Sequence, residues 1–207
     1  MRVAVFGSFY RGYYVLGELL YGPCKDLIKV VGVATDDPAQ HYINAKNRVW
    51  KYPHSQREEI MVADLARDHD IPVYREKIKT ENFYDIFEKK WKPDLCLMAT
   101  FGQLINLRLI KFPQLGFYNF HPSDIGDWPS RYAGCNPFEA MFKQGEKICT
   151  ITLHEVNEEF DQGGRVACSD AIMIPPGVTV TDMHKISAPV AACLLRKMLP
   201  GLLRLSP

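Results

Sequence analysis

Along the first two-thirds of the chain, short apolar runs alternate with longer segments whose apolar residues recur at helical spacing. The short runs are rich in Val and Ile, as strands are, and the longer segments place their apolar residues on one side of a helix. Strands that alternate with helices predict a parallel sheet with right-handed crossovers. We therefore expect strands at 2–6, 27–34, 71–74, 94–99 and 116–120, and helices at 13–20, 57–69 and 81–90.

The pattern changes after residue 147. Two strand-like stretches, 148–155 and 165–174, are joined by a loop that holds Asp161, which predicts antiparallel strands added to the sheet. Residues 179–203 then predict a closing helix with Thr181 or Asp182 as its N-cap. No repeat or linker divides the 207 residues. We expect a single domain over 1–207, an α/β fold with a Rossmann-like, mostly parallel sheet flanked by helices and an antiparallel addition near the C-terminus.

Composition and charge narrow the class of protein. A net charge of +1 supplies no field that would attract nucleic acid. No uninterrupted apolar run approaches the ~18 residues that a membrane span needs. The six cysteines are scattered without a Cys-x-x-Cys pair, which fits a reducing compartment and neither a disulfide framework nor a zinc site. We expect a cytoplasmic protein with no metal, no membrane partner and no nucleic acid partner.

Three predicted strand ends carry polar or glycine-rich sequence, at 7–12, 100–103 and 119–123. Open parallel sheets bind their ligands outside the carboxyl ends of the strands. The first of these segments resembles a phosphate-binding turn, but it lacks the Gly-x-Gly-x-x-Gly pattern and a P-loop lysine. Binding of an anionic part of a substrate is therefore favoured over binding of a dinucleotide, and a glycine that only permits a tight turn is the plainer alternative.

The most informative residues are Asn119 and His121. In a strand, residues two apart point to the same side, so both side chains would project together. A neutral amide and an imidazole suit the stabilisation of an oxyanion that forms on a carbonyl. A histidine that caps the next turn and an asparagine that closes a loop explain the same residues equally well. Asp161 with Gly163 and Gly164, taken alone, is ordinary hairpin chemistry.

The two stretches together resemble the folate-dependent formyltransferases, a family that includes methionyl-tRNA, glycinamide ribonucleotide and sugar-nucleotide N-formyltransferases. Its motif is Asn-x-His-(Pro/Gly)-Ser, followed later in the chain by an Asp-x-Gly loop. Here these are residues 119–123 and 161–163, and the segments 93–105 and 131–137 add weaker matches. The resemblance implies that 10-formyltetrahydrofolate is the formyl donor and that no metal takes part.

The resemblance also implies roles for individual residues. Asn119 and His121 would donate hydrogen bonds to the oxyanion, while Asp161 would pair with His121, favour its charged form and accept a proton from the attacking amine. The residues expected to bind the donor are Phe101, Gly102, Gln103, Leu104, Ile105, Phe160 and Gln162. The residues expected to bind the acceptor are Ser8, Tyr10, Arg11, Ser123, Arg131 and Tyr132.

The resemblance leaves the acceptor open. The chain shows no β-barrel domain like that of methionyl-tRNA formyltransferases, and its charge is near zero, which argues against transfer RNA. An amino sugar nucleotide is our first choice, ahead of glycinamide ribonucleotide or an amino-acid derivative, and a homodimer is compatible with all three. Hydrolysis of the donor by water would use the same three residues, but the extra N-terminal domain of such hydrolases is absent. The catalytic residue types argue against an inactive binding protein, and the missing glycine fingerprint argues against an oxidoreductase.

Several features depart from the family or stay ambiguous. The segment between Ser123 and Gly134 is longer than expected, and Arg131 precedes the aromatic residue where a basic residue usually follows it. The aromatic and basic residues within 36–56 fit either a solvated loop or an acceptor-binding loop. The remaining histidines lack metal-ligand spacing and are interpreted as surface or packing residues: His41, His54, His69, His154 and His184.

Overall fold

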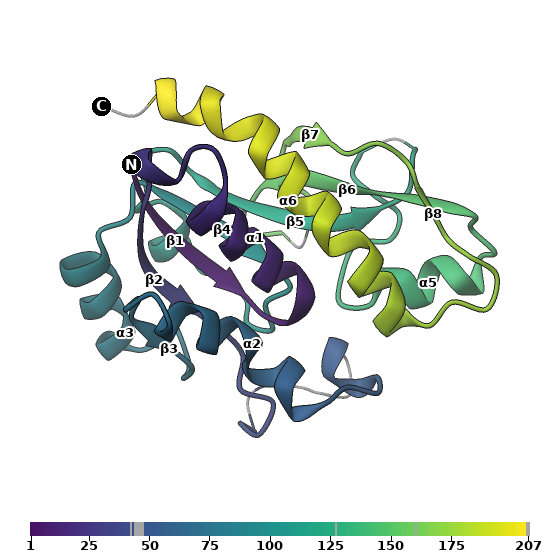
Figure 1. Ribbon diagram of the computed structural model, residues 1–207, viewed down its shortest axis with the longest axis horizontal. Helices are drawn as coiled ribbons and strands as arrows, with labels where there is room; N and C mark the ends of the chain where they lie inside the picture. The colour runs from purple at the N-terminus through teal and green to yellow at the C-terminus, as the bar shows by residue number, and fades with distance from the viewer. Residues whose placement is uncertain (42, 44–47, 127, 160, 206–207) are drawn as a thin grey trace.

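The computed structural model describes residues 1–41, 43, 48–126, 128–159 and 161–205. A sheet with the strand order β3-β2-β1-β4-β5-β6-β7 runs through its centre, and β8 pairs with β6 (Figure 1). The strands are β1 (Arg2–Gly7), β2 (Lys29–Ala34), β3 (Val73–Tyr74), β4 (Leu95–Ala99), β5 (Phe117–Ser123), β6 (Ile148–Glu155), β7 (Arg165–Cys168) and β8 (Ile172–Met173). The α-helices are α1 (Phe9–Tyr21), α2 (Gln56–Arg67), α3 (Glu81–Asp85), α4 (Leu107–Ile110), α5 (Pro137–Lys143) and α6 (Val180–Arg204). The remaining elements among the described residues are two 3₁₀ helices, η1 (Lys25–Leu27) and η3 (Val49–Lys51), and a π-helix, η4 (Ile86–Trp91).

The first five strands pair in parallel, whereas β6 is antiparallel to β5, β7 and β8. This arrangement confirms the predicted fold class. After β3 the chain returns to the other side of β1, so β1 and β4 lie side by side with Gly7 opposite Ala99. The strand order therefore reverses at the carboxyl ends of β1 and β4, which is where open sheets of this kind bind ligands.

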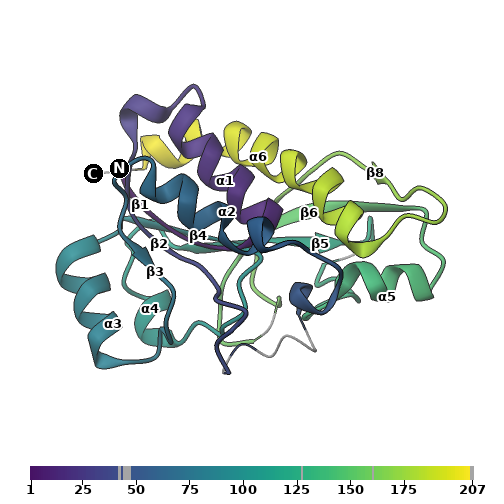
Figure 2. The same ribbon diagram turned by 60° about the horizontal axis from the view of Figure 1, so that its bottom comes forward.

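Helices cover both faces of the sheet. Figure 2 shows α1, α2 and α6 on one face and α3 and α4 on the other. Because side chains alternate along a strand, Val3 and Val5 pack with α1 and α6, while Ala4 and Phe6 pack with the aromatic residues of α3 and η4. Burial on both faces explains why the central strands are nearly continuous apolar runs in the sequence.

Helix α1 begins at Phe9, four residues earlier than the periodicity predicts. Tyr10, Arg11 and Gly12 therefore lie in its first turns and not in an open loop. A Cβ atom on Gly12 would lie 2.6 Å from the carbonyl carbon of Gly7, so these two glycines allow the strand end and the helix to approach closely. Gly7 and Gly12 thus have a plain steric role in the fold.

Other boundaries differ from the predictions for local reasons. Strand β5 continues through His121 to Ser123 because β6 pairs with it along this whole length. The stretch 165–174 forms two short strands instead of one, and α4 and α5 were not predicted. The N-cap of α6 is neither Thr181 nor Asp182. It is Thr179, whose Oγ1 accepts a hydrogen bond from the backbone N–H of Asp182 at 3.1 Å.

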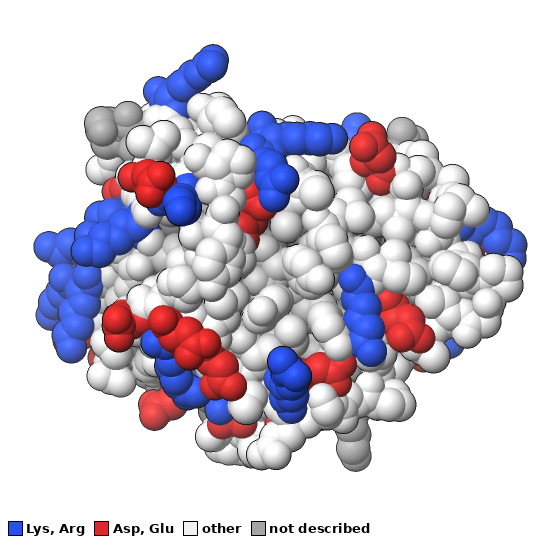
Figure 3. Space-filling model, viewed as in Figure 1, with Lys and Arg blue, Asp and Glu red and all other residues white. Residues whose placement is uncertain are grey.

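Helix α6 is the one helix in the described ranges with the length and mean hydropathy of a membrane-crossing segment. It packs along α1 and the sheet and buries twelve of its residues, as the core helix of an α/β domain does. Figure 3 shows this face of the molecule, with side chains of both charges scattered over it and uncharged surface between them.

Candidate active site

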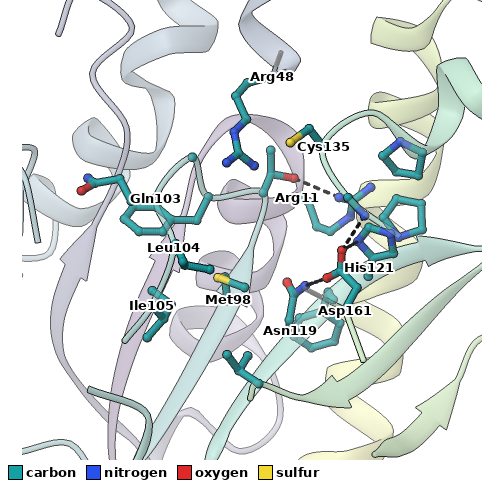
Figure 4. A pocket seen from close by; sticks show the side chains of 18 of the residues that line it. Arg11, Arg48, Met98, Gln103, Leu104, Ile105, Asn119, His121, Cys135 and Asp161 are labelled. Atoms are coloured by element: carbon teal, nitrogen blue, oxygen red, sulfur yellow. Dashed lines mark hydrogen bonds and ion pairs between the residues drawn. The ribbon is translucent and has the colours of Figure 1, made fainter. Parts of the chain in front are cut away.

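A pocket opens at the carboxyl ends of β1, β4 and β5, at the point where the strand order reverses. Figure 4 shows two contrasting sides, with Gln103, Leu104 and Ile105 on one and Arg11 and His121 on the other. The residues predicted from the sequence that line this pocket are Arg11, Phe101, Gly102, Gln103, Leu104, Ile105, Asn119, His121 and Asp161. Two stretches that are far apart in the sequence, 119–123 and the loop of Asp161, therefore meet in one place.

Asp161 is the centre of a buried polar cluster. Its Oδ1 accepts a hydrogen bond from Nδ2 of Asn119 at 3.0 Å, and its Oδ2 accepts one from the backbone N–H of Gly134 at 2.8 Å. Nδ1 of His121 lies 3.4 Å from Oδ2. Burial raises the pKa of this carboxyl, but the hydrogen bond with His154, the charge of His121 and the N–H of Gly134 outweigh it and hold the pKa at about 2. Asp161 is thus ionised at neutral pH.

The backbone of Asp161 has a φ of 51°, and Thr100 at the end of β4 has a φ of 58°. A left-handed φ is tolerated by Asp but is rare for a β-branched residue such as Thr. Both residues line the pocket. Strained backbone of this kind clusters at functional sites, where the surrounding structure holds it in place.

His121 does not have the raised pKa that pairing with Asp161 alone would give. Burial lowers its pKa below the ordinary value, and the charges of His154 and Arg11 act in the same direction. The carboxylate of Asp161 and the carbonyl of Tyr132, 3.1 Å from Nε2, oppose this without overcoming it. Asp161 therefore favours the charged form of His121, as expected, but desolvation is the larger effect and leaves the pKa below its ordinary value.

The side-chain amide of Asn119 is oriented by its neighbours. Nδ2 donates to Asp161 and also lies 3.1 Å from Nε2 of His154. Figure 4 shows the amide nitrogen towards Asp161 and the amide oxygen towards the pocket. The sequence predicted that the NH₂ group would face a reacting carbonyl, but here the protein itself engages that group.

His154 belongs to the cluster, although the sequence interpretation placed it among surface or packing residues. It lies opposite Asn119 in the β5–β6 register, is 2% exposed, and its Nε2 is 3.4 Å from Oδ1 of Asp161. Trp128, from the segment between Ser123 and Gly134, stacks on the ring of His154 at 4.9 Å and donates from Nε1 to the carbonyl of Gly163 at 2.7 Å. The longer segment thus packs against the loop that carries Asp161.

The opposite side of the pocket is apolar and its loop is held firmly. Gln103 accepts a hydrogen bond from the N–H of Ile78 at 3.0 Å and donates to the carbonyl of Glu76 at 3.1 Å. The N–H of Gly102 donates to Oδ1 of Asp36 at 2.9 Å. Burial raises the pKa of Asp36 to about 6, although its hydrogen bonds to Gly102 and to the Trp50 indole act against this. The hydrogen bonds of Gln103 and Gly102 thus hold the loop 101–105 in place before a ligand binds.

Three residues predicted to bind the acceptor lie away from the pocket lining. The Ser8 hydroxyl accepts from the N–H of Asp36 at 2.9 Å and is buried, while the Tyr10 hydroxyl donates to Glu58. The Ser123 hydroxyl is bonded to two threonines of β6. All three hydroxyl groups therefore already have protein partners, and their roles in binding stay predictions.

The other predicted binding residues have varied positions. Arg131 is largely exposed and pairs with Asp124 and Glu146, while Tyr132 contributes the carbonyl near His121. Gln162 lines an adjoining hollow together with Gly134 and Cys135, which also line the main pocket. Phe160 lies outside the described residues.

The segment 36–56 contributes to both the core and the pocket. Trp50 is 4% exposed, packs on Phe9 at 5.5 Å, and donates from Nε1 to Asp36 at 3.2 Å. Arg48 and Val49 line the pocket. In its described part the segment is therefore not a fully solvated loop, because Trp50 anchors it while Arg48 and Val49 reach the pocket, and a role in acceptor binding stays a prediction.

The cluster has the parts of an acyl-transfer site. A buried carboxylate orients an amide and an imidazole beside a cavity that has an apolar side and a cationic side. Within the described ranges, no group of three or more His, Cys, Asp or Glu side chains is arranged to hold a metal ion. The expectation of a metal-free site stays a prediction.

Comparison with known proteins agrees with this chemistry. The family model described as formyl transferase matches residues 1–196. The bifunctional polymyxin resistance protein ArnA of Wigglesworthia glossinidia brevipalpis is 28% identical over 99% of this chain and 28% of its own length. The methionyl-tRNA formyltransferase of Kosmotoga olearia is 28% identical over 70% of this chain and 47% of its own length. The chain thus spans less than half the length of these curated relatives.

Solved structures share the fold. The phosphoribosylglycinamide formyltransferase from Anaplasma phagocytophilum superposes with a TM-score of 0.72 at 19% identity, covering 99% of this chain and 87% of that one. A formyltetrahydrofolate deformylase from Pseudomonas syringae pv. tomato gives a TM-score of 0.68 at 18% identity, covering 98% of this chain and 61% of that one. At such identities the likeness establishes the architecture alone.

Proposed function

This chain belongs to the formyl transferase family, and from that premise we propose that it transfers the formyl group of 10-formyltetrahydrofolate to the primary amine of a small acceptor. The observation that carries the proposal is the convergence of Asn119, His121 and Asp161 on one side of the pocket, opposite the loop 101–105. As parts of the same proposal, residues 1–207 form one catalytic domain, and the protein works in the cytoplasm.

The apolar side of the pocket suits the flat ring of the donor. Leu104, Ile105 and Met98 offer apolar contact, and Gln103 is fixed by its own hydrogen bonds. A ring bound there would direct its formyl group towards the polar cluster around Asp161 (Figure 4). Ligand pockets commonly combine an apolar wall with a few well-placed polar groups in this way.

In the proposed reaction, the neutral amine of the acceptor attacks the formyl carbon, and the carbonyl oxygen becomes an oxyanion. Asn119 and His121 are the side chains of the cluster that we expect to donate hydrogen bonds to this oxyanion. In this structure Nδ2 of Asn119 donates to Asp161, and Nε2 of His121 donates to the carbonyl of Tyr132. Each side chain would therefore exchange a protein acceptor for the oxyanion as charge develops. One such donor is worth ~3–4 kcal/mol in a transition state.

Asp161 would hold the reacting groups in place and manage the proton. Its low pKa keeps it ionised, so it can stabilise a positive charge that develops on the attacking amine and accept a proton from it, directly or through water. The pKa of His121 lies below its ordinary value, which favours the neutral ring, and a neutral ring can also accept that proton. Collapse of the tetrahedral intermediate then breaks the bond to N10 of the folate, which takes up the proton removed from the amine, and leaves the formamide product.

For the acceptor, we propose an amino sugar nucleotide ahead of glycinamide ribonucleotide or an amino-acid derivative. Two cationic side chains, Arg11 and Arg48, line the pocket and suit an acceptor that carries phosphate groups. The formal net charge of +1 gives little support for binding transfer RNA, whose phosphates are usually neutralised by many basic residues.

The test is whether consumption of 10-formyltetrahydrofolate depends on an amine. We expect the donor to be stable with the enzyme alone and to be consumed when a suitable amine is added, with the formamide detected by mass spectrometry. Equal consumption with and without amine would show a hydrolase instead. No consumption with any amine, together with no binding of a folate analogue, would contradict both activities.

A further inference from the structure

Arg11 is a buried cation whose hydrogen-bonding capacity is only partly used. It extends from the first turn of α1, is 2% exposed, and lines the pocket. Nη1 donates to Oγ1 of Thr100 at 2.9 Å and Nη2 donates to Oγ of Ser187 at 3.2 Å. Its Nε is buried and has no hydrogen-bond partner. A guanidinium has five N–H groups, so most of them have no acceptor among the residues that the structure describes.

Arg11 also lacks a counter-charge. Among the residues that the structure describes, no carboxylate lies within ion-pair distance of it, whereas four more exposed arginines, Arg67, Arg108, Arg131 and Arg196, each pair with Asp or Glu. Burial lowers its pKa to about 10, and the group is still charged at neutral pH. A buried charge without a partner destabilises the fold, so side chains of this type are almost never fully buried unless paired. The missing partner is therefore best sought in a ligand.

A second unpartnered nitrogen lies in the same pocket. His184 lines the pocket from α6, and its buried Nδ1 has no hydrogen-bond partner. The ring is fixed between Phe9 at 5.6 Å and Phe138 at 5.1 Å. The charge of Arg11 acts on His184, which places the two groups near each other. This part of the pocket, the recess between Arg11 and His184, thus offers one ligand a charged guanidinium and a further polar nitrogen.

The position of Arg11 assigns this recess to the acceptor. Figure 4 shows Arg11 on the side of His121 and Asp161, away from Leu104 and Ile105 on the apolar side. The charge of Arg11 also acts on His121, so an anion bound to Arg11 lies close to the proposed reacting atoms. An acceptor amine has to reach the same atoms, whereas the donor ring fits the apolar side.

On the basis of the proposed function, we propose that Arg11 binds an anionic group of the acceptor, a carboxylate or a phosphate, held close to the primary amine that receives the formyl group. A planar guanidinium fork matches both anions with two parallel hydrogen bonds. Thr100 and Ser187 fix the fork from two elements, so the binding geometry exists before the ligand arrives. Binding would supply the counter-charge that the fold leaves out.

The first experiment measures anion binding without chemistry. Calorimetric titration with inorganic phosphate and with acetate would be carried out on the wild-type protein, on Arg11→Met and Arg11→Lys, and on the exposed control Arg67→Met. We expect one of the two anions to bind, with affinity reduced at least ~10-fold in Arg11→Met, partly kept in Arg11→Lys and unchanged in the control. No binding of either anion to the wild type, or equal binding to Arg11→Met, would overturn the inference.

The second experiment uses pairs of acceptors in which one member carries an anionic group and the other does not. Glycine is compared with glycinamide, and glucosamine 6-phosphate with glucosamine, so that the two pairs distinguish a carboxylate from a phosphate. We expect the wild type to prefer the charged member of one pair in kcat/KM, and Arg11→Met to lose that preference through KM. Equal use of charged and neutral acceptors would overturn the inference while leaving formyl transfer intact.

A third readout separates ligand binding from a structural role. Arg11→Met removes a buried unpaired charge, so we expect its Tm to be no lower than that of the wild type. A lowered Tm with equal loss of activity towards every amine would show that Arg11 serves the fold and would overturn the inference. Conversely, anion binding that depends on Arg11 without formyl transfer to any amine would support the anion site and count against the proposed function.

Discussion

Asn119 donates a hydrogen bond from Nδ2 to Oδ1 of Asp161 at 3.0 Å, although the two residues are 42 positions apart in the chain. Each residue has an ordinary local explanation by itself, as a loop asparagine and a hairpin aspartate. Their contact shows that β5 and the loop after β6 form one site. The contact also fixes the amide, because a carboxylate can only accept, and so the NH₂ group must face it.

Substitution of Asn119 or His121 by Ala tests the oxyanion role. We expect each variant to stay folded and to lose turnover at least ~100-fold, because either change removes a donor that is engaged in the transition state. Steady-state rates with saturating donor and circular dichroism would check this. Unchanged turnover in a folded variant would contradict the assignment of that residue.

Asp161→Asn separates a catalytic carboxylate from a turn former. Asn tolerates the left-handed φ of 51° and keeps much of the loop geometry, so stability should change little while the rate collapses. The charge of Asp161 raises the pKa of His121, so its loss should lower that pKa further. NMR titration of the His121 ring measures the shift.

The matched control is Asp124→Asn, a partly buried carboxylate that pairs with Arg131 and lies outside the pocket lining. This variant should keep the rate and the pKa of His121. If the pKa of His121 is the same in Asp161→Asn and in the wild type, the two side chains do not interact as proposed.

Much of the fold could be predicted because it follows from local pattern. The runs at β1 and β4 are apolar on both faces, and His121 and Asn119 share one side of a strand by simple alternation. The resemblance that joins residues 119–123 to 161–163 added the contact between them. Local periodicity and one motif pair were therefore sufficient for the architecture and for the centre of the site.

The rest depended on tertiary packing that no local pattern encodes. His154 enters the site because the antiparallel register places it opposite Asn119, and a shift by one residue would have turned it to the other face. The sequence predicts a loop at Arg11, because Gly12 is typical of a turn, whereas in the structure Gly12 allows a close contact between helix and strand. The lowered pKa of His121 follows from its burial, which becomes visible only in the folded chain.

Ligands of the folate class should stabilise the protein. A folate analogue present at about 100 times its Kd should add about 2.7 kcal/mol to the free energy of unfolding by mass action. Thermal melting measures this, and NAD, NADP and ATP should leave Tm unchanged. A larger shift with NAD than with the analogue would instead favour an oxidoreductase.

Leu104→Ser should weaken the Tm shift that the analogue produces, because Leu104 is 40% exposed and lines the apolar side of the pocket. The matched control is Leu205→Ser, which changes an exposed leucine at the end of α6, outside the pocket lining. If the analogue raised the Tm of both variants equally, the donor would not bind against the apolar side of the pocket.

His154→Phe should move the acid limb of the pH–rate profile. His154 lowers the pKa of Asp161 through a hydrogen bond and through its charge, whereas Phe keeps the ring that stacks on Trp128. The pKa of Asp161 should therefore rise from about 2 towards its ordinary value, and activity that needs the ionised carboxylate should be lost at a higher pH. A profile of kcat/KM against pH that superposes on that of the wild type would disprove this coupling.

The buried carboxyl of Asp36 should make stability fall as pH rises. Burial raises its folded pKa from 3.8 to about 6, so its contribution to stability is complete below the unfolded pKa and is lost as pH increases through about 6. The charged form then costs on the order of 3 kcal/mol. Asp36→Asn stays neutral at every pH, although it forfeits one of the two acceptors for Gly102 and Trp50.

That lost acceptor lowers Tm by a similar amount at all pH values, whereas the charge affects only the wild type above its pKa. The difference in Tm between Asp36→Asn and the wild type should therefore shift in favour of the variant between about pH 4 and about pH 7.5. Thermal melts at both pH values measure this difference directly. A constant difference would mean that Asp36 is ionised throughout this range, and that its hydrogen bonds from Gly102 and Trp50 outweigh its burial.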